Sequence, residues 1–360
     1  MSSSSAAPAI NKPHWMLCLG LECMRRGEGY NETISSTTTI MDSLLSPIPE
    51  KEREERSKHW TGPMTAMVDM VHGEKDFYMP KRFLEIQDEV RGLEIREDDL
   101  FIVSYPKAGT TWSQEMVWQL REGMNLEGGR VAIPKRVPFI EVECLVQRGP
   151  GAPDKSVEGF KTLPSPRIGK THLRSPYLPK DLLSTKGKVI YVTRNPKDVC
   201  VSFYHHEKLL NNHQYTGSFE KFAELFLEGK VAYGSYWEHL KYGLEIRQLK
   251  NVLFITYEDM KKDIKTEMRR VLEFMEWPEL SQKKLDALAD HLSFSSCKVN
   301  PALNFNPDGD ELDEKNPKEF IRKGVVGDWK NMFSTELSEA FDAKMKSYPE
   351  LMDFTMQYDA

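Results

Sequence analysis

Short apolar runs typical of buried β-strands alternate with helical stripes over most of the chain. Leu100 to Ser104 is a β-rich apolar run that ends at Tyr105-Pro106. Thr110 to Arg121 follows, with apolar residues at i, i+4 and i+8 as on one face of a helix. This alternation predicts a parallel sheet with helices on both faces, whose ligands bind beyond the carboxyl ends of the strands.

Further strands and helices repeat this pattern. A strand is predicted over Val189 to Thr193, and a helix follows over Pro196 to Leu210. A third strand over Asn251 to Thr256 precedes a helix with an apolar stripe from Ile264 to Met275, and Ser218 is suited to cap another helix. We therefore expect an α/β fold with a single domain and a central, mostly parallel sheet flanked by helices.

The first 75 residues lack this pattern. They contain a Ser/Thr cluster at Ser35 to Thr39 and a charged run from Lys51 to Lys58, with no sustained period of 2 or 3.6. We expect residues 1–75 to be a disordered N-terminal extension with a short helix in the charged run, and residues 76–360 to form the globular domain.

Charge and cysteine usage exclude several classes of protein. A formal net charge of −6 argues against a nucleic-acid or acidic-membrane partner. The five cysteines are scattered, and no CxxC pair suggests a metal site. The apolar run Trp15 to Leu21 is too short to span a bilayer. These features predict a cytoplasmic protein in a reducing compartment, with no metal.

The turn between the first strand and its helix, Tyr105 to Trp112, has the composition of an anion-binding cradle. Its glycine exposes backbone N–H groups at a helix N-terminus, and Lys107 adds a full positive charge. Thr110 and Thr111 add hydroxyl donors. The turn is P-loop-like but differs from the nucleotide triphosphatase motif, because Lys107 precedes the only glycine. The alternative is an ordinary strand–helix turn with a surface lysine.

Two other segments could bind anions. Arg194 follows the second strand and can grip a phosphate bidentately, with Ser202 two turns further along the helix. The alternative is a salt bridge between Arg194 and Asp198 at the helix start. Arg322-Lys323-Gly324 suits a loop that closes over an anion, and its alternative is a solvated basic turn.

Two histidine segments are candidates for chemistry. His172 in Lys170-Thr171-His172 can take a proton from a hydroxyl, although a single histidine is more often structural. His205-His206-Glu207 contains adjacent histidines that point to different helix faces, so packing is favoured over a metal site there.

Taken together, these segments resemble the cytosolic sulfotransferase family in their order and spacing, over roughly Phe77 to Asp353. The resemblance implies transfer of a sulfonate from 3′-phosphoadenosine 5′-phosphosulfate (PAPS) to a hydroxyl or amine of a small, largely apolar acceptor. The other product would be 3′,5′-adenosine diphosphate (PAP). No metal is implied, because lysine and arginine supply the counter-charge.

The resemblance also assigns roles to individual residues. The catalytic residues would be His172 as general base, Lys107 at the leaving phosphate and Lys170 at the transferring group. The cofactor-binding residues would be Lys107, Ala108, Gly109, Thr110, Thr111, Trp112, Arg194, Ser202, Tyr257, Phe294, Arg322, Lys323 and Gly324. Trp112 and Phe294 would sandwich the adenine, and Tyr257 would hydrogen-bond its edge. The acceptor pocket would contain Phe139, Phe203, Tyr204 and the loop Asn304 to Lys318.

Four positions depart from the usual pattern of the family. Ala108 replaces a common serine, which removes a side-chain donor, and Leu292 stands where a threonine often contacts the adenine. Arg174 replaces a common proline, and His206 stands where an apolar pocket residue is common. The last two bear on the identity of the acceptor rather than on the reaction.

A C-terminal segment predicts weak homodimerisation. Lys330, Thr335 and Glu339 resemble the family's short dimerisation motif, with Ser334 as a mild departure and Thr335 in place of valine. The alternative is a surface turn with a helix start at Ser334.

Other functions compete with sulfonate transfer. An inactive sulfotransferase-like nucleotide-binding or scaffold protein would lack the base or the leaving-group lysine, yet His172 and Lys107 are both present. A nucleotide kinase-like enzyme would need a lysine after the glycine of the turn. A Golgi sulfotransferase would need a membrane anchor.

Overall fold

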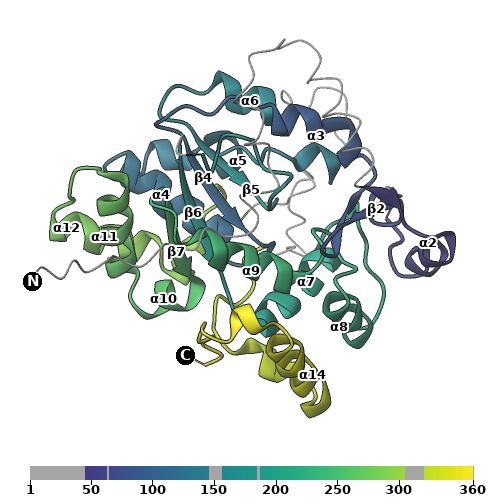
Figure 1. Ribbon diagram of the computed structural model, residues 1–360. Helices are drawn as coiled ribbons and strands as arrows, with labels where there is room; N and C mark the ends of the chain where they lie inside the picture. The colour runs from purple at the N-terminus through teal and green to yellow at the C-terminus, as the bar shows by residue number, and fades with distance from the viewer. Residues whose placement is uncertain (1–44, 63–64, 146–155, 185–186, 305–319, 360) are drawn as a thin grey trace, which may run out of the picture. The chain divides into compact units, whose positions relative to one another are not determined.

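The computed structural model describes residues 45–62, 65–145, 156–184, 187–304 and 320–359, and Leu44–Ala360 form one compact unit (Figure 1). The strands are β1 (Ser46–Pro47), β2 (Met70–Gly73), β3 (Phe77–Pro80), β4 (Leu100–Ser104), β5 (Ile168–Thr171), β6 (Lys188–Thr193) and β7 (Val252–Thr256). The α-helices are α2 (Glu50–Ser57), α3 (Phe83–Arg91), α4 (Thr110–Arg121), α5 (Ile133–Arg136), α6 (Ser156–Thr162), α7 (Pro196–Leu209), α8 (Phe219–Leu227), α9 (Tyr236–Ile246), α10 (Tyr257–Lys262), α11 (Ile264–Met275), α12 (Gln282–His291), α13 (Phe294–Val299) and α14 (Thr335–Lys346). Short 3₁₀ turns are η3 (Thr65–Met67), η4 (Gly128–Arg130), η5 (Val142–Cys144), η6 (Asp328–Asn331) and η7 (Pro349–Leu351).

The central sheet has four parallel strands in the order β5-β4-β6-β7. Because all four strands run the same way, their carboxyl ends meet at one edge of the sheet. At the other edge Asp99, just before β4, is fully buried and pairs with buried Arg167, just before β5, at 2.5 Å. The predicted fold class, an α/β domain with a parallel sheet flanked by helices, is confirmed.

Side chains alternate between the two faces of this sheet, as the pleat requires. Ile102, Ile190 and Ile255 lie on one face, in the core cluster that also contains the apolar stripes of α4, α11 and α12. On the other face, the ring of Phe101 contacts Phe160 of α6, with 5.0 Å between ring centres. The sheet is therefore buried on both sides, which explains its continuous apolar runs.

Helix caps follow the sequence closely. Asn195 caps α7, and its side chain accepts a hydrogen bond from the Asp198 backbone N–H at 2.8 Å, with Pro196 at the first helical position. Ser218 caps α8 through the Lys221 backbone N–H. Both predicted helix starts are confirmed.

The N-terminal boundary at residues 75 and 76 is corrected by the structure. Strands β1, β2 and β3 form a three-stranded antiparallel sheet within the same compact unit as the parallel sheet. Arg56 of α2, the helix expected in the charged run, is buried and donates to the carbonyls of Met67 and Lys230. The contact with Lys230 spans 174 residues of the chain, so local periodicity did not reveal it. Residues 1–44 of the predicted extension lie outside the described residues.

Two further observations concern the helices and the cysteines of the described residues. Among the described helices, none is both long and apolar enough to cross a bilayer. The three described cysteines, Cys144, Cys200 and Cys297, are free and buried.

Candidate functional site

Each of the four parallel strands ends at a residue of one cavity. Lys107 follows β4, His172 follows β5, Arg194 follows β6 and Tyr257 follows β7. All four line a cavity of about 920 Å³, within the size range of sites for small molecules. The cavity therefore opens at the carboxyl edge of the sheet, where the sequence predicted a ligand site.

The turn after β4 has a backbone that few residues tolerate. Lys107 and Gly109 both have positive φ, 68° and 103° respectively. A Cβ on Gly109 would lie 2.7 Å from Cδ2 of Tyr257, so only glycine lets the turn pack against that ring. Thr110 and Thr111, the first residues of α4, and Trp112 line the cavity with this turn.

Lys107 is a half-buried cation that lines the cavity. Its Nζ lies 4.0 Å from the ring centre of Phe320. Burial, together with the charges of Lys170, Arg194 and Arg322, lowers the pKa of Lys107 to about 7. An anion bound beside this ammonium group would favour its charged form and raise that pKa again.

His172 has one ring nitrogen committed to the backbone. Its Nδ1 lies 2.7 Å from the carbonyl oxygen of Ser104 and 3.3 Å from the Ser104 hydroxyl. Since a carbonyl can only accept, Nδ1 carries the proton, and Nε2 keeps its lone pair. Burial and then the charge of Lys170 hold the pKa of His172 well below its ordinary value, so the ring is neutral. A neutral imidazole with a free lone pair can accept a proton.

Glu141 positions His172 and was not assigned a role from the sequence. It is fully buried, and its Oε1 accepts from the His172 backbone N–H at 2.6 Å and from the Tyr233 hydroxyl at 3.2 Å. Burial raises the pKa of Glu141 to about 7. The signal available in the sequence was a lone acidic residue at the end of an apolar segment, which is too weak to identify such a role.

Phe139 and Lys170 lie beside this histidine. Residues 138–140 pair with the edge of β5 through the backbone. The Lys170 backbone N–H donates to the Pro138 carbonyl at 2.8 Å, and the Ile140 backbone N–H donates to the Lys170 carbonyl at 3.1 Å. The Lys170 ammonium lies 3.8 Å from the ring centre of Phe139, and that ring meets His172 edge-on at 5.1 Å. Burial lowers the pKa of Lys170 to about 8, although the charge of Glu141 opposes the shift.

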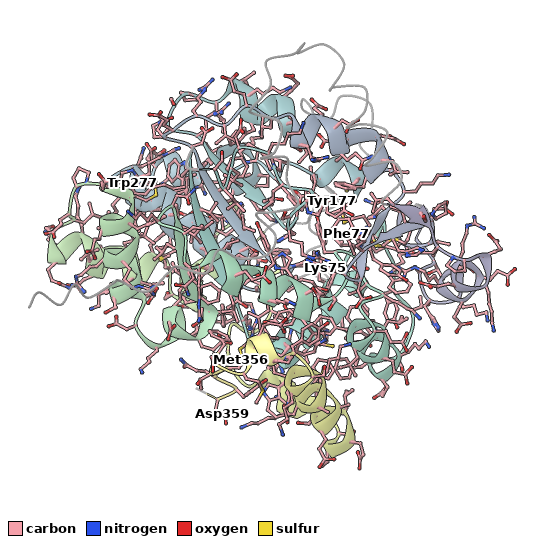
Figure 2. The ribbon with its side chains drawn as sticks, in the orientation of Figure 1. Lys75, Phe77, Tyr177, Trp277, Met356 and Asp359 are labelled. Atoms are coloured by element: carbon pink, nitrogen blue, oxygen red, sulfur yellow. The ribbon has the colours of Figure 1, made fainter. Side chains whose placement is uncertain are left out.

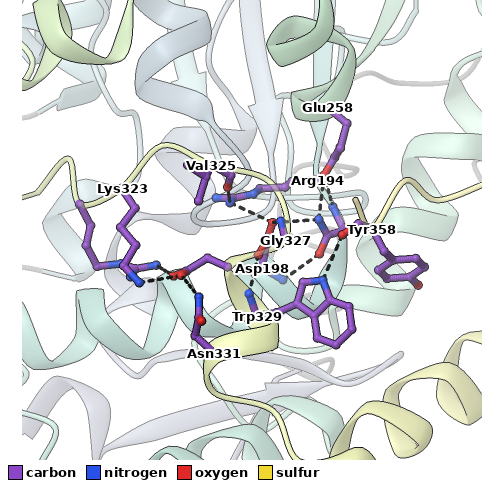
Figure 3. Close-up of polar contacts among 12 residues, drawn as sticks. Arg194, Asp198, Glu258, Lys323, Val325, Gly327, Trp329, Asn331 and Tyr358 are labelled. Carbon is purple, nitrogen blue, oxygen red and sulfur yellow. Dashed lines mark hydrogen bonds and ion pairs between the residues drawn. The ribbon is translucent and has the colours of Figure 1, made fainter. Parts of the chain in front are cut away.

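Arg194 connects the second strand–helix turn to the C-terminal segment (Figure 3). Its Nη2 donates to the Val325 carbonyl at 2.8 Å and pairs with Asp198 at 3.2 Å. Asp198 also accepts from the backbone N–H groups of Gly327 and Trp329, at 2.9 and 3.0 Å. The ion pair weighed as the alternative role of Arg194 therefore exists. Nevertheless Arg194 lines the cavity, and its buried Nε has no hydrogen-bond partner among the described residues.

Arg322 and Lys323 are paired within the chain. Both contact the carboxylate of Asp328, at 2.5 and 2.7 Å (Figure 3). The pKa of Asp328 falls to about 2, because hydrogen bonds from these two cations outweigh the opposing effect of burial. Gly324 has a positive φ of 64°, and a Cβ there would lie 2.4 Å from the ring of Phe294. The loop thus brings two cations and a close backbone approach to the cavity wall.

An aromatic group lines the cavity next to Arg194. The ring of Tyr257 lies 4.2 Å from the Arg194 guanidinium and meets Trp112 edge-on at 5.5 Å. The Trp112 indole N–H donates to the Leu292 carbonyl at 2.9 Å, and Phe294 lines the same wall. Leu292 therefore contributes a backbone acceptor that orients Trp112.

Two of the predicted site residues do not line the cavity. Ala108 is fully buried, and its backbone N–H donates to the Tyr105 carbonyl at 3.2 Å, so its amide already has a partner within the turn. Tyr204 packs edge-on against Phe219 and Tyr215 instead. Its neighbour Phe203 does line the cavity, because adjacent residues of a helix point in different directions.

Arg174 is also absent from the cavity wall, although it departs from the family pattern. It is buried and donates to the Lys75 carbonyl at 2.5 Å. Its guanidinium lies 5.7 Å from the ring of Phe77, which stacks on Tyr177 at 3.9 Å beside Lys75 (Figure 2). Arg174 therefore contacts the turn between β2 and β3, and its bearing on the acceptor stays a prediction.

The two adjacent histidines of α7 differ in position. His206 lines the cavity together with Ser202 and Phe203, whereas His205 does not. Within the part of the chain that the structure describes, no group of three or more His, Cys, Asp and Glu residues is arranged to hold a metal ion.

The segment predicted to form the dimer makes contacts within its own chain. Ser334 caps α14 and accepts from the Leu337 backbone N–H at 3.1 Å, and Thr335 and Glu339 are exposed. Lys330 pairs with Asp359 of its own chain. The loop after Asn304 that was assigned to the acceptor pocket, residues 305–318, lies outside the described residues.

Comparison with known proteins places these features in a family context. Residues 97–355 match the family described as sulfotransferase domain. The chain is 40% identical to mouse sulfotransferase 1A1, over 77% of this chain and 93% of that protein. Its fold is similar to retinol dehydratase solved with androsterone and the inactive cofactor PAP, with a TM-score of 0.75 and 25% identity over 87% and 97% of the two chains. Mouse sulfotransferase SULT7A1, solved with PAP, has a TM-score of 0.61 and 29% identity over 79% and 95% of the two chains.

Proposed function

The chain belongs to the sulfotransferase family and is a PAPS-dependent sulfotransferase, and from that premise we propose how its cavity works. We propose that it transfers the sulfonate of PAPS in line to a hydroxyl or amine of a small, largely apolar acceptor. His172 is the general base, Lys107 stabilises the leaving phosphate and Lys170 contacts the transferring group.

The residues present fit PAPS. The unpartnered Nε of Arg194 can donate to a phosphate oxygen. Gly109 and Gly324 let two cavity-lining turns pack closely against the rings of Tyr257 and Phe294. We assign the 3′-phosphate to Arg194, Ser202, Arg322, Lys323 and Gly324, and the 5′-phosphosulfate to Lys107, Gly109, Thr110 and Thr111. Trp112, Tyr257 and Phe294 would hold the adenine. These residues define the cofactor end of the cavity.

When bound, PAPS supplies an activated sulfonate. At the acceptor end of the cavity, which we define as Phe139, Lys170, His172, His206 and Tyr233, His172 takes the proton of the acceptor hydroxyl at Nε2. The imidazolium that results is held by the Ser104 carbonyl at Nδ1. Lys107 supplies positive charge where negative charge develops on the leaving oxygen.

The observation that carries this proposal is the hydrogen bond from His172 Nδ1 to the Ser104 carbonyl. That bond fixes the tautomer, so the nitrogen left over is a proton acceptor. The lowered pKa of His172, caused chiefly by burial, keeps this acceptor unprotonated at neutral pH.

The test is the His172→Ala variant. We expect sulfonate transfer from labelled PAPS to a panel of hydroxylated molecules to be abolished, while calorimetric affinity for PAP stays within a few-fold of wild type. His205→Ala is the matched control, since His205 does not line the cavity, and it should keep its turnover. Near-wild-type turnover in His172→Ala would show that another group is the base. A wild-type protein that binds PAP but transfers sulfonate to no acceptor would favour the inactive alternative.

Two broader expectations belong to this proposal. We propose that the enzyme works in the cytoplasm, and that it forms a weak homodimer through Lys330 to Glu339. Light scattering on wild type and on Thr335→Glu tests the second expectation, because a two-fold contact would bring the two introduced carboxylates together.

A further inference from the structure

We propose that His206 hydrogen-bonds a second polar group of the acceptor, so that the enzyme favours acceptors that carry another hydroxyl besides the one that is sulfonated. This inference rests on the proposed function. It starts from a cavity-lining imidazole whose buried Nδ1 has no hydrogen-bond partner among the described residues.

The ring of His206 sits in an aromatic setting. It meets Phe320 edge-on, with 5.7 Å between ring centres, and Phe203 lies 6.5 Å away at a tilt. Neither neighbour offers a hydrogen bond in the ring plane. A buried polar atom without a partner costs free energy, so this nitrogen favours a ligand that can satisfy it.

Helix α7 places His206 beyond the region assigned to PAPS. Ser202 and His206 are one turn apart, about 6 Å along the helix axis, and both line the cavity. Phe320, on which His206 packs, also contacts the Lys107 ammonium at 4.0 Å. His206 is therefore close to Lys107 and to the proposed reaction centre. It lies further along α7 than Asp198, the residue of the first turn that pairs with Arg194.

The imidazole of His206 is neutral. Burial lowers its pKa well below the ordinary value, and the charges of Lys107, His213 and Lys170 lower it further. A neutral imidazole has one donor and one acceptor nitrogen. A hydroxyl is the group that can use either nitrogen, since it both donates and accepts.

The neighbouring polar side chains are already engaged, unlike His206. Glu207 accepts from the Trp60 indole at 2.8 Å and contacts His213 at 3.1 Å. Burial opposes ionisation of Glu207, but His213 and the Trp60 hydrogen bond outweigh it and hold its pKa below the ordinary value. Glu207 therefore already has partners, and the unpartnered nitrogen of His206 is the group left to take a hydroxyl of the acceptor.

The experiment measures specificity with matched pairs of phenols. Each pair consists of a 4-alkylphenol and the same phenol with a terminal hydroxyl on the alkyl chain, at chain lengths from two to five carbons. The readout is the ratio of kcat/KM for the hydroxylated member to that for the plain member, measured within each enzyme, so that differences in folded fraction cancel.

We expect wild type to prefer the hydroxylated member at one or more chain lengths, and His206→Phe to lower that ratio roughly three- to tenfold, as for one neutral hydrogen bond. His206→Gln, which keeps a donor and an acceptor, should retain part of the preference. His205→Phe makes the same change one residue outside the cavity wall and should leave the ratio unchanged.

Several results would overturn the inference. One is a wild-type ratio at or below one at every chain length, and another is a ratio that His206→Phe leaves unchanged. If those enzymes still sulfonate the plain phenols, the proposed function stands and only the role of His206 is lost. If wild type sulfonates neither member of any pair yet sulfonates other hydroxylated molecules, the phenol-based inference fails alone. If it sulfonates no acceptor at all, both proposals fail.

Discussion

The cofactor end and the acceptor end of the cavity are built in different ways. At the cofactor end, three of the charged groups have acidic partners within the chain: Arg194 pairs with Asp198, and Arg322 and Lys323 pair with Asp328. At the acceptor end, aromatic rings surround His172 and His206. A phosphate is bound by cations and hydrogen-bond donors, whereas a small apolar acceptor is selected by the shape of the pocket and by a few polar contacts.

The largest effect is expected where the two ends meet. Lys107→Met removes the charge assigned to the leaving phosphate and should lower kcat roughly 100- to 1000-fold. Steady-state sulfonate transfer measures this loss, and circular dichroism with thermal unfolding checks that the variant is folded. If kcat falls less than tenfold, the leaving oxygen is stabilised by another group.

The next largest effect concerns the 3′-phosphate. Arg194→Gln should weaken PAP binding roughly 10- to 100-fold, the range expected for a lost charge-assisted hydrogen bond, and should leave binding of 5′-AMP nearly unchanged. Calorimetry with both nucleotides measures the difference. Equal losses for PAP and AMP would mean that Arg194 acts through its contacts with Asp198 and Val325 rather than on the phosphate.

A smaller effect should appear as a pH dependence of the cofactor end. Lys107 has a pKa of about 7 before a ligand binds, so its charge is present below pH 7 and is lost as the pH rises. The affinity for PAP should therefore fall between pH 7 and pH 8, by up to about tenfold per unit. Lys107→Met should abolish this slope. A wild-type affinity that is flat across the same range contradicts the lowered pKa.

The smallest effect separates two residues that the sequence treated alike. Tyr204→Phe should change kcat/KM less than about twofold, which is under roughly 0.4 kcal/mol, because Tyr204 packs outside the cavity. Phe139→Leu should raise the KM for the acceptor, since Phe139 lines the cavity against Lys170 and His172. If the two variants have the same effect, the assignment of Phe139 to the acceptor end, without Tyr204, is wrong.

The sequence predicted the turns that carry Lys107 and Arg194 more completely than the segments around His172. The turn around Lys107 and the cap at Asn195 depend on contacts within a few residues, so glycine, proline and capping side chains signal them directly. Strand β5 was not assigned from the sequence, because its four residues, Ile168–Thr171, are too few to show a period.

By itself, the sequence determined the strand–turn–helix units and the places of Lys107 and Arg194 in the turns that follow β4 and β6. Only the tertiary structure decided that Glu141 holds His172, that Tyr204 and Arg174 turn away from the cavity, and that His206 turns into it. The physical reason is the range of the contacts. Turns and caps are settled by neighbours in the chain, whereas the acceptor end is assembled from segments far apart in sequence, whose side-chain directions depend on how the helices pack.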